Sequence, residues 1–186
     1  MTSPAKTDLE HYDNSWYKQP PRWKAVTWWV VGNMFINSSL LVPYSFKRFV
    51  LRCFGAKIGK GVVIKAQVVI KYPWLLSVGD FVWIGEQVWI DNLCTVTIAS
   101  NACLSQGAML LTGNHNYTST NFDLIVGQIS LDEGVWIGAK AIVCPGVQCH
   151  SHTVLCAGSV ATKNLESYQI YQGNPAVMIK ERKIKH

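Results

Sequence analysis

The sequence predicts an all-β chain that winds into a parallel β-helix, a prism with three short strands to each coil. Three observations lead to this prediction: an aliphatic residue recurs at every sixth position, a small or β-branched residue follows four positions later, and the repeat breaks at three regularly placed points. Six residues is not a helical period, whereas positions four and six of one repeat lie two apart and share a strand face. Three such sides close a triangular coil, and stacked coils pair main chain to main chain along the axis.

The aliphatic series starts at Ile58, and thirteen of its fifteen positions are Ile, Leu or Val. In four repeats Gly follows the aliphatic residue, where we expect it to relieve the backbone at a corner. Ordinary hairpins would instead need Asn-Gly or Asp-Gly turns at a spacing of about 8–12 residues, and the sequence lacks them. The series is Ile58, Ile64, Ile70, Val78, Ile84, Ile90, Ile98, Leu104, Leu110, Leu131, Ile137, Val143, Cys149, Leu155 and Ala161, and the glycines are Gly59, Gly79, Gly85 and Gly138.

The interruptions of the repeat are also informative. Each of the three follows the third side of a coil, so all three are expected on one edge of the prism. Two small bulges (71–77 and 91–97) and one long loop (111–130) should therefore stack there, on coils about 4.8 Å apart. A long loop within so regular a scaffold usually serves function.

The prediction divides the chain into three parts. Residues 1–54 form a polar arm followed by a Trp-rich, hydrophobic helical segment, and residues 55–166 form about five coils of β-helix. Residues 167–186 form a basic tail, in which Pro175–Lys183 is predicted to be a short helix. A chain of 186 residues suits one domain with a sizeable core.

Two compatible interpretations of residues 22–54 stay open. Polar residues interrupt the apolar run, so it falls short of the ~18 unbroken apolar residues of a membrane span. The segment either covers the open hydrophobic end of the first coil, which solenoids need, or lies at a membrane surface with its indoles at headgroup depth and its cations facing anionic lipid. The side chains concerned are Trp23, Trp28, Trp29, Lys47, Arg48 and Arg52.

Composition narrows the class of partner and compartment. The formal net charge of +6 indicates an anionic partner, and without any nucleic-acid-binding signature this is phosphate on a small cofactor or a lipid. The six cysteines form neither a CxxC motif nor a zinc-finger spacing, and the start has no secretion signal. We therefore expect reduced thiols, a cytoplasmic protein and no structural metal.

The repeat, the loop and the tail together resemble the hexapeptide-repeat acetyltransferases, whose prism is left-handed. Within that family the chain is most similar to the colanic acid biosynthesis group, with the galactoside, maltose and nodulation-factor acetyltransferases as more distant relatives. The resemblance covers residues 50–186 and extends into the hydrophobic lead-in. The segments that show it are FGAKIGKGVVI (54–64), VGDFVWIGEQVWIDNL (78–93), TGNHNYTS (112–119), VWIGAKAIVCPGV (135–147), AGSVATKN (157–164) and YQGNPAVMIKER (171–182).

The resemblance implies a homotrimer that binds acetyl-CoA in a groove between neighbouring prisms. It implies that the histidine of TGNH, His115, is catalytic and that the Trp of VWIG, Trp136, lines the pantetheine channel. The turns after this motif would offer backbone groups to CoA, and basic residues near the end of the chain would bind its phosphates. The backbone groups would come from Gly138, Ala139, Ala157 and Gly158, and the basic residues for the phosphates would be Lys163 and Arg182.

Acyl transfer from a thioester to a hydroxyl needs a base, and imidazole titrates near neutrality. Strand alternation predicts that Asn114 points inward and His115 outward. Asp91, on the same edge one coil earlier, is expected to orient the imidazole, with Asp123 in the loop as a rival. Asn92 is expected to bind a sugar hydroxyl, and Asn92, Asn114 and Asp123 complete the predicted acceptor site. No cysteine adjoins the histidine in sequence, so we expect direct transfer rather than an acyl-enzyme.

The leading hypothesis is an acetyl-CoA-dependent O-acetyltransferase that acts on a lipid-linked or nucleotide-linked saccharide in polysaccharide assembly. The more distant relatives carry two adjacent acids where this chain has Asp91, Asn92 and Leu93, so the acceptor stays open. An N-acetyltransferase for an amino sugar is the close alternative, and a non-catalytic β-helix module that binds a membrane or partner is an alternative of another class. A gamma-type carbonic anhydrase would need a third zinc ligand near His150 and His152, which the spacing does not supply.

Overall fold

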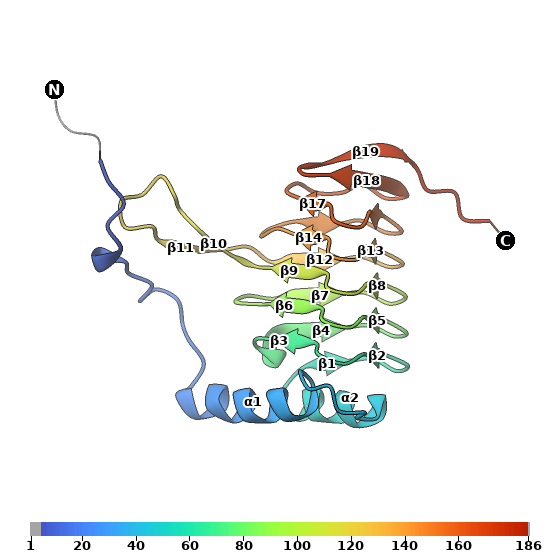
Figure 1. The fold of residues 1–186 in the computed structure, drawn as a ribbon, viewed down its shortest axis with the longest axis horizontal. Coiled ribbons are helices and arrows are strands. Elements are labelled where there is room, and N and C mark those ends of the chain that lie inside the picture. The colour runs from blue at the N-terminus through green and yellow to red at the C-terminus, as the bar shows by residue number, and fades with distance from the viewer. Residues whose placement is uncertain (1–4, 186) are drawn as a thin grey trace.

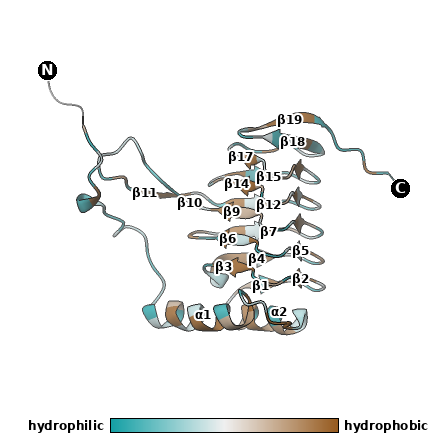
Figure 2. Cartoon of the chain, viewed as in Figure 1, coloured by the Kyte–Doolittle hydropathy of each residue, from teal (hydrophilic) through white to brown (hydrophobic). Residues whose placement is uncertain are grey.

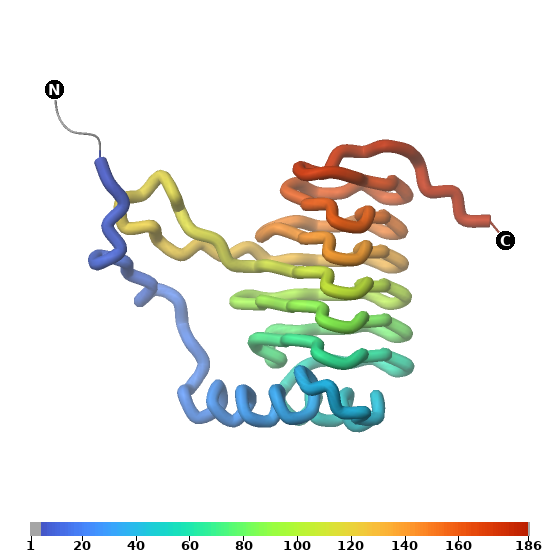
Figure 3. The backbone as a smooth tube through the Cα atoms, in the orientation of Figure 1, coloured from blue at the N-terminus to red at the C-terminus, as the bar shows by residue number. Residues whose placement is uncertain are grey.

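The computed structural model describes residues 5–185, which form a three-sided prism of stacked coils (Figure 1). Each side is a sheet whose strands pair in parallel with those of the neighbouring coils. The backbone follows the same path from coil to coil, as the tube in Figure 3 shows. The predicted parallel β-helix is therefore confirmed, with five complete coils and a sixth that begins with a bridge of Leu165 to Cys149 in the first sheet.

The strands are short and belong to three sheets. The first sheet holds β1 (Lys57–Ile58), β4 (Leu76–Val78), β7 (Val96–Ile98), β12 (Ile129–Leu131) and β15 (Gln148–Cys149). The second holds β2 (Val63–Ile64), β5 (Trp83–Ile84), β8 (Cys103–Leu104), β13 (Trp136–Ile137), β16 (Val154–Leu155), β18 (Gln169–Gly173) and β19 (Ala176–Glu181). The third holds β3 (Val69–Ile70), β6 (Trp89–Asp91), β9 (Met109–Leu111), β14 (Ile142–Val143) and β17 (Val160–Ala161). Helices α1 (Arg22–Phe35) and α2 (Tyr44–Cys53) precede them, 3-10 turns lie at Leu9–His11 and Pro73–Leu75, and β10 (Gly113–His115) pairs with β11 (Leu124–Val126).

The sixfold series forms the core of the prism. None of its fifteen residues exposes more than 8% of its surface. Eleven of the twelve small or β-branched residues four positions later are buried as well, and the exception, Cys94, lies in the second bulge. Since each buried Val, Leu or Ile side chain contributes about 1.5–3 kcal/mol, the repeat itself supplies most of the hydrophobic stabilisation.

The glycines that follow the aliphatic residues serve close stacking rather than a special backbone conformation. A Cβ on Gly79 would lie 2.6 Å from the backbone nitrogen of Ser100 in the next coil. The left-handed backbone occurs two residues after these positions, for example at Gly61 (φ 66°) and Lys140 (φ 54°). The expected relief of the corner by the first glycine is therefore wrong, because the coil above, and not the torsion angle, excludes a side chain there.

We expect Gly79→Asn to lower the free energy of unfolding by about 2–3 kcal/mol, because its side chain would push two coils apart. Gly107→Asn is the matched control: Gly107 has φ 66°, and the nearest atom to an added Cβ is Cγ of the Lys140 side chain, at 3.4 Å. Asn tolerates this backbone region, and Asn101 already occupies the equivalent corner with φ 61°. The control should change stability by less than about 1 kcal/mol in urea unfolding. Equal losses in both variants would contradict the stacking explanation.

Helices α1 and α2 lie across the end of the prism beside the first coil (Figure 1). The N–H groups of each coil donate to carbonyls of the following coil, as Val63 does to Val82 at 2.9 Å. The first coil has no coil before it, so many of its carbonyls need donors from elsewhere. The indole of Trp28 and the side chains of Lys47, Arg48 and Arg52 supply them.

These capping bonds correct the expected position of three cations. Trp28 donates to the carbonyl of Ile70 at 2.8 Å, and Lys47 donates to that of Lys65 at 2.6 Å. Arg48 donates to the carbonyl of Val62 at 2.7 Å, and Arg52 donates to that of Ile58 at 2.6 Å. Lys47 is 2% exposed, and this burial lowers the pKa of its ammonium group. The three cations therefore bind the first coil instead of facing lipid, because unpaired backbone oxygens are the nearer acceptors.

The predicted C-terminal helix is wrong. Residues 176–181 form β19, which runs antiparallel to β18. Because β18 pairs with β16 on one side, its other edge would be left open, and β19 covers that edge. The sixfold repeat has ended by this point, so the period does not indicate which secondary structure follows.

Candidate active site

All three interruptions of the repeat leave the prism at the edge between the third and first sheets. Strands β3, β6 and β9 lie side by side in one sheet, with Ile70 in register with Ile90 and Asp91 with Leu111. The stacking predicted for 71–77, 91–97 and 111–130 is therefore confirmed. We call this edge the seam.

The long loop at the seam is a projecting hairpin (Figure 1). Strands β10 and β11 pair antiparallel, with His115 opposite Leu124. Beyond them, the backbone N–H of Asn116 donates to the carbonyl of Asp123 at 2.8 Å, and the hydroxyl of Ser119 donates to the Asp123 carboxylate at 2.8 Å. These bonds fix the end of β10, where His115 stands.

The imidazole of His115 is half-buried and held in one orientation. Its Nδ1 lies 2.9 Å from the backbone oxygen of Phe122, and the two rings stack with centroids 4.4 Å apart and planes 8° apart. A carbonyl oxygen only accepts hydrogen bonds, so Nδ1 carries the hydrogen and Nε2 the lone pair. The geometry thus leaves Nε2 to act as a base.

The predicted orientations of Asn114 and His115 are reversed. Asn114 is exposed, with its side-chain oxygen accepting from the backbone N–H of His115 at 2.8 Å, whereas His115 is half-buried. The alternation of the prism strands does not extend to β10, because this strand has left the prism. Its two faces are set by Phe122 and the N-terminal arm rather than by the core.

Neither carboxylate that was expected to orient the imidazole contacts it. Asp91 forms an ion pair with Lys71, with Nζ and Oδ1 2.9 Å apart, and the Asp123 carboxylate braces the hairpin through Ser119. The Phe122 carbonyl does this task instead. Phe122 was not predicted from the sequence, because an acidic side chain was expected in this role. Every residue has a main-chain oxygen, so residue type does not indicate which one contacts the imidazole.

Asn92 is not available to a sugar hydroxyl. It is fully buried, and its amide bonds both backbone groups of Tyr72: Oδ1 accepts from the N–H at 2.9 Å and Nδ2 donates to the carbonyl at 2.7 Å. The expectation that Asn92 contacts the substrate is wrong, because its amide already joins the two bulges inside the seam.

The N-terminal arm packs against the hairpin. The ring of Tyr12 lies 5.8 Å from the His115 ring, and the hydroxyl of Tyr17 donates to the carbonyl of Leu93 at 2.6 Å. Burial, with smaller effects of nearby ionisable groups, raises the pKa of Tyr17 to about 12. No pattern in the sequence predicts the contact between Tyr12 and His115, because about a hundred residues separate them.

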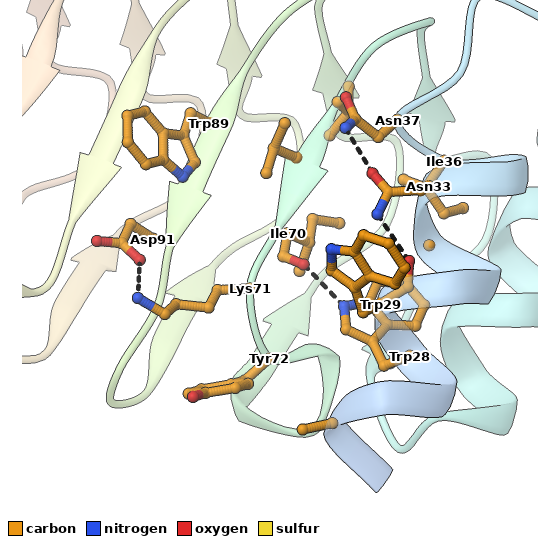
Figure 4. A pocket seen from close by; sticks show the side chains of 14 residues that line it. Trp28, Trp29, Asn33, Ile36, Asn37, Ile70, Lys71, Tyr72, Trp89 and Asp91 are labelled. Carbon is orange, nitrogen blue, oxygen red and sulfur yellow. Dashed lines mark hydrogen bonds and ion pairs between the residues drawn. The ribbon is translucent and has the colours of Figure 1, made fainter. Parts of the chain in front are cut away.

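A groove of about 370 Å³ lies between α1 and the outer face of the third sheet (Figure 4). Its walls combine apolar and polar groups, as small-molecule sites do. Figure 4 shows the indole of Trp29 on the helix side, and the indole of Trp89 and the Lys71–Asp91 ion pair on the sheet side. Asn33 on α1 and Asn37 just after it add amide groups, which are joined by a hydrogen bond of 2.9 Å from Nδ2 of Asn37 to Oδ1 of Asn33.

The residues expected to bind CoA differ in what they can offer. Trp136 is 46% exposed on the second sheet, and its Nε1 donates to the Ser105 hydroxyl at 2.9 Å. Gly138 is buried, its N–H donates to Leu155 at 2.7 Å and its carbonyl accepts from Ala141 at 3.1 Å, so its backbone is unavailable to CoA. A Cβ here would lie 2.5 Å from the next coil, which explains the glycine.

The following corner is more open. Ala157 and Gly158 are exposed, and within residues 5–185 the N–H groups of Ala139 and Ala157 have no backbone acceptor. Lys163 is exposed near the seam. Arg182 instead spans two corners on a different edge, where Nη1 donates to the carbonyls of Gly134 at 2.9 Å and His152 at 3.0 Å.

The two halves of the predicted site lie on different edges of one prism. His115 projects from the seam, between the third and first sheets, whereas Ala139 and Ala157 lie at the edge between the second and third sheets. The sixfold repeat already predicts this separation, because each repeat from Ile58 onward is one side of the prism and therefore assigns each corner to one of the three edges.

Burial makes four of the six cysteines poorer nucleophiles. Burial raises the pKa of Cys94, Cys103 and Cys144, and raises that of Cys149 to about 12. All six cysteines are unpaired. Among residues 5–185, no three His, Cys, Asp or Glu side chains gather as a metal site would need.

Known proteins provide direct comparisons. No protein-family model matches the chain. The putative colanic acid biosynthesis acetyltransferase WcaF of Escherichia coli (strain K12) is 40% identical over 159 residues, which cover 86% of this chain and 87% of that protein. Galactoside O-acetyltransferase of Escherichia coli (strain K12) is 26% identical over 129 residues, or 68% of this chain and 64% of that protein.

Solved structures share the fold. A hexapeptide-repeat-containing acetyltransferase from Vibrio cholerae superposes with a TM-score of 0.79 at 18% identity, covering 87% of this chain and 92% of that one. A galactoside acetyltransferase in complex with coenzyme A gives 0.77 at 21% identity, covering 86% and 81%. The fold is thus the left-handed β-helix of acyltransferases. The 40% sequence identity to WcaF shows the family of this protein. The chain belongs to the hexapeptide-repeat acetyltransferases.

Proposed function

We propose that this acetyltransferase moves an acetyl group from acetyl-CoA to a saccharide hydroxyl in polysaccharide assembly, with His115 as general base. The observation that carries the proposal is the bond of 2.9 Å between Nδ1 of His115 and the Phe122 carbonyl, which leaves Nε2 free to accept a proton. The name of the 40% identical relative supports a polysaccharide pathway, and the coenzyme A complex of the galactoside enzyme supports the donor.

The reaction needs only one proton carrier. Nε2 of His115 takes the hydroxyl proton as the acceptor oxygen attacks the thioester carbon. The Phe122 carbonyl stabilises the resulting imidazolium through the Nδ1–H bond. When the C–S bond breaks, the imidazolium returns the proton to the sulfur of CoA. Because burial keeps the nearby thiols protonated, direct transfer is favoured over an acyl-enzyme.

The enzyme acts as a homotrimer with active sites between subunits. One chain carries its base on the seam and the free N–H groups of Ala139 and Ala157, with Trp136 beside them, on another edge. A neighbour that places its seam against this second edge completes a site. Such head-to-tail contacts between different edges close into a ring, and a three-sided prism suits a ring of three.

The groove beside α1 binds part of the saccharide. Indole faces such as those of Trp29 and Trp89 stack on the apolar C–H faces of sugars, and the Asn33 amide and Asp91 carboxylate bond hydroxyls. Strand β6, which supplies Trp89 and Asp91, is the immediate neighbour of β9, from which the hairpin of His115 emerges. We place the enzyme in the cytoplasm, which its unpaired cysteines support, with peripheral membrane contact through residues 22–54.

Release of free CoA thiol from acetyl-CoA, measured with a panel of neutral, amino and lipid-linked saccharides, tests the function. We expect release that depends on a hydroxyl acceptor, and an O-acetyl ester in the product. Transfer only to amino sugars would assign the enzyme as an N-acetyltransferase instead. No release with any saccharide, by protein that binds acetyl-CoA, would contradict the saccharide proposal.

A further inference from the structure

The two helices that cap the prism carry many hydrophobic residues, drawn brown in Figure 2, and several of their apolar side chains are exposed. Besides Trp23 and Trp29, six apolar side chains from α1, α2 and the segment between them each expose at least half of their surface, and Leu41 is fully exposed. They are Val26, Val30, Met34, Leu40, Leu41 and Phe49. We call this surface the cap face. Contiguous exposed apolar groups of this kind mark an interaction surface.

Helix α1 is apolar on two opposite sides. Trp28 and Gly32 are buried against the first coil, whereas Val26 and Val30, half a helical turn away, face outward. A surface helix ordinarily has one apolar side, which faces the core. The second apolar side of α1 therefore packs against nothing within residues 5–185.

Charge is distributed unevenly around this end. Ten of the seventeen Lys and Arg residues, and none of the eleven Asp and Glu residues, lie between Asn14 and Gly79. This segment builds the last part of the arm, the cap and the first coil. Three of its cations bind the first coil, and three more, Lys60, Lys65 and Lys71, pair with acids of the second coil at 4.0, 3.9 and 2.9 Å. Others, including Arg22 and Lys57, are exposed. The rest of the chain has four more acidic than basic residues.

We propose that the cap face docks on the surface of an anionic lipid bilayer, with the helices lying in the interface. An apolar surface on a segment that carries exposed cations and, from residue 14 to residue 79, no acids matches such a bilayer in both hydrophobicity and charge. A second copy of the same face is a poor occupant, because it would bring the exposed cations of this end, among them Arg22 and Lys57, toward those of the first copy. None of the helices in residues 5–185 is long and apolar enough to cross a bilayer, so the contact is peripheral.

Docking in this way defines the class of acceptor. Helix α1 supplies both the cap face, through Val26 and Val30, and one wall of the groove, through Trp29 and Asn33. A saccharide in the groove therefore lies close to the bilayer surface. Resting on the proposed acetyl transfer, we infer that the acceptor is a saccharide joined to a membrane lipid, whose anchor stays in the bilayer while its sugar enters the groove.

Sedimentation with vesicles tests the docking. The full chain is mixed with vesicles of phosphatidylcholine alone, or with about 30% phosphatidylglycerol. We expect binding to the anionic vesicles that weakens with salt. Leu41→Glu/Phe49→Glu should reduce it by about tenfold or more, because both side chains would carry charge into the interface. Leu41→Glu alone should give a smaller loss in the same direction, and since Leu41 is fully exposed, this change does not disturb the fold.

Val177→Glu/Ile179→Glu is the matched control. These two residues are 60% and 46% exposed on β19, at the opposite end of the prism, and the charge change is the same. Equal losses in both double variants would show a nonspecific charge effect and overturn the proposal. A wild-type chain that does not bind anionic vesicles would also overturn the proposal, and so would a chain that dimerises through the cap face. Acetyl transfer to a soluble saccharide should persist in both variants, so a chain that binds vesicles without transfer contradicts only the proposed function.

Discussion

His115→Ala should lower kcat for acetyl transfer by about 10²–10⁴-fold while leaving the KM for acetyl-CoA within about twofold, since a general base contributes roughly that much to the rate. The physical reason is the loss of Nε2, the ring atom that the Phe122 carbonyl leaves unprotonated. Steady-state kinetics with saturating saccharide measures both constants.

His115→Asn separates catalysis from structure. The asparagine amide can still donate to the Phe122 carbonyl, but it has no basic nitrogen. We expect it to be as inactive as the alanine variant, with unchanged thermal unfolding. His150→Ala, which removes a histidine that pairs with Asp132 away from the seam, should keep full activity. Rescue by Asn would make His115 a structural residue, and normal turnover of His115→Ala would remove it from the mechanism.

Trp136→Ala should raise the KM for acetyl-CoA by about tenfold or more, with kcat at saturation reduced much less. An exposed indole that a ligand covers typically contributes more than about 1–2 kcal/mol to binding, and each 1.4 kcal/mol is a factor of ten. Its hydrogen bond of 2.9 Å to Ser105 fixes the indole at the same edge of the prism as Ala139, which lies one coil further along than Ser105. Direct titration of CoA by calorimetry should give the same loss of affinity.

Trp83→Ala is the matched control for this prediction. Trp83 is 58% exposed on the same sheet, and Cys103 lies between it and Trp136 in the register. Its removal should leave the KM for acetyl-CoA unchanged within about twofold, because the proposed donor site lies two coils further along. A drop in kcat with unaltered CoA affinity in Trp136→Ala would reject its assignment to the donor channel.

The sequence by itself determined the architecture of this protein. A side chain that recurs every sixth residue assigns inward positions, sheets and corners without any knowledge of distant contacts, since strand alternation is a local property. The same count brings the three interruptions to one seam and hence locates the loop of His115. Residue types and the family resemblance then indicated the chemistry of that loop.

Only the tertiary structure decided how the side chains are used. The imidazole is oriented by a main-chain oxygen at Phe122, Asn92 links two bulges, and the cations of α2 bind the carbonyls of the first coil. The C-terminal segment became a strand because β18 had an open edge. Each of these outcomes depends on which unpaired backbone group lies nearby in space, and a backbone group is the same in every residue, so the sequence carries no sign of it.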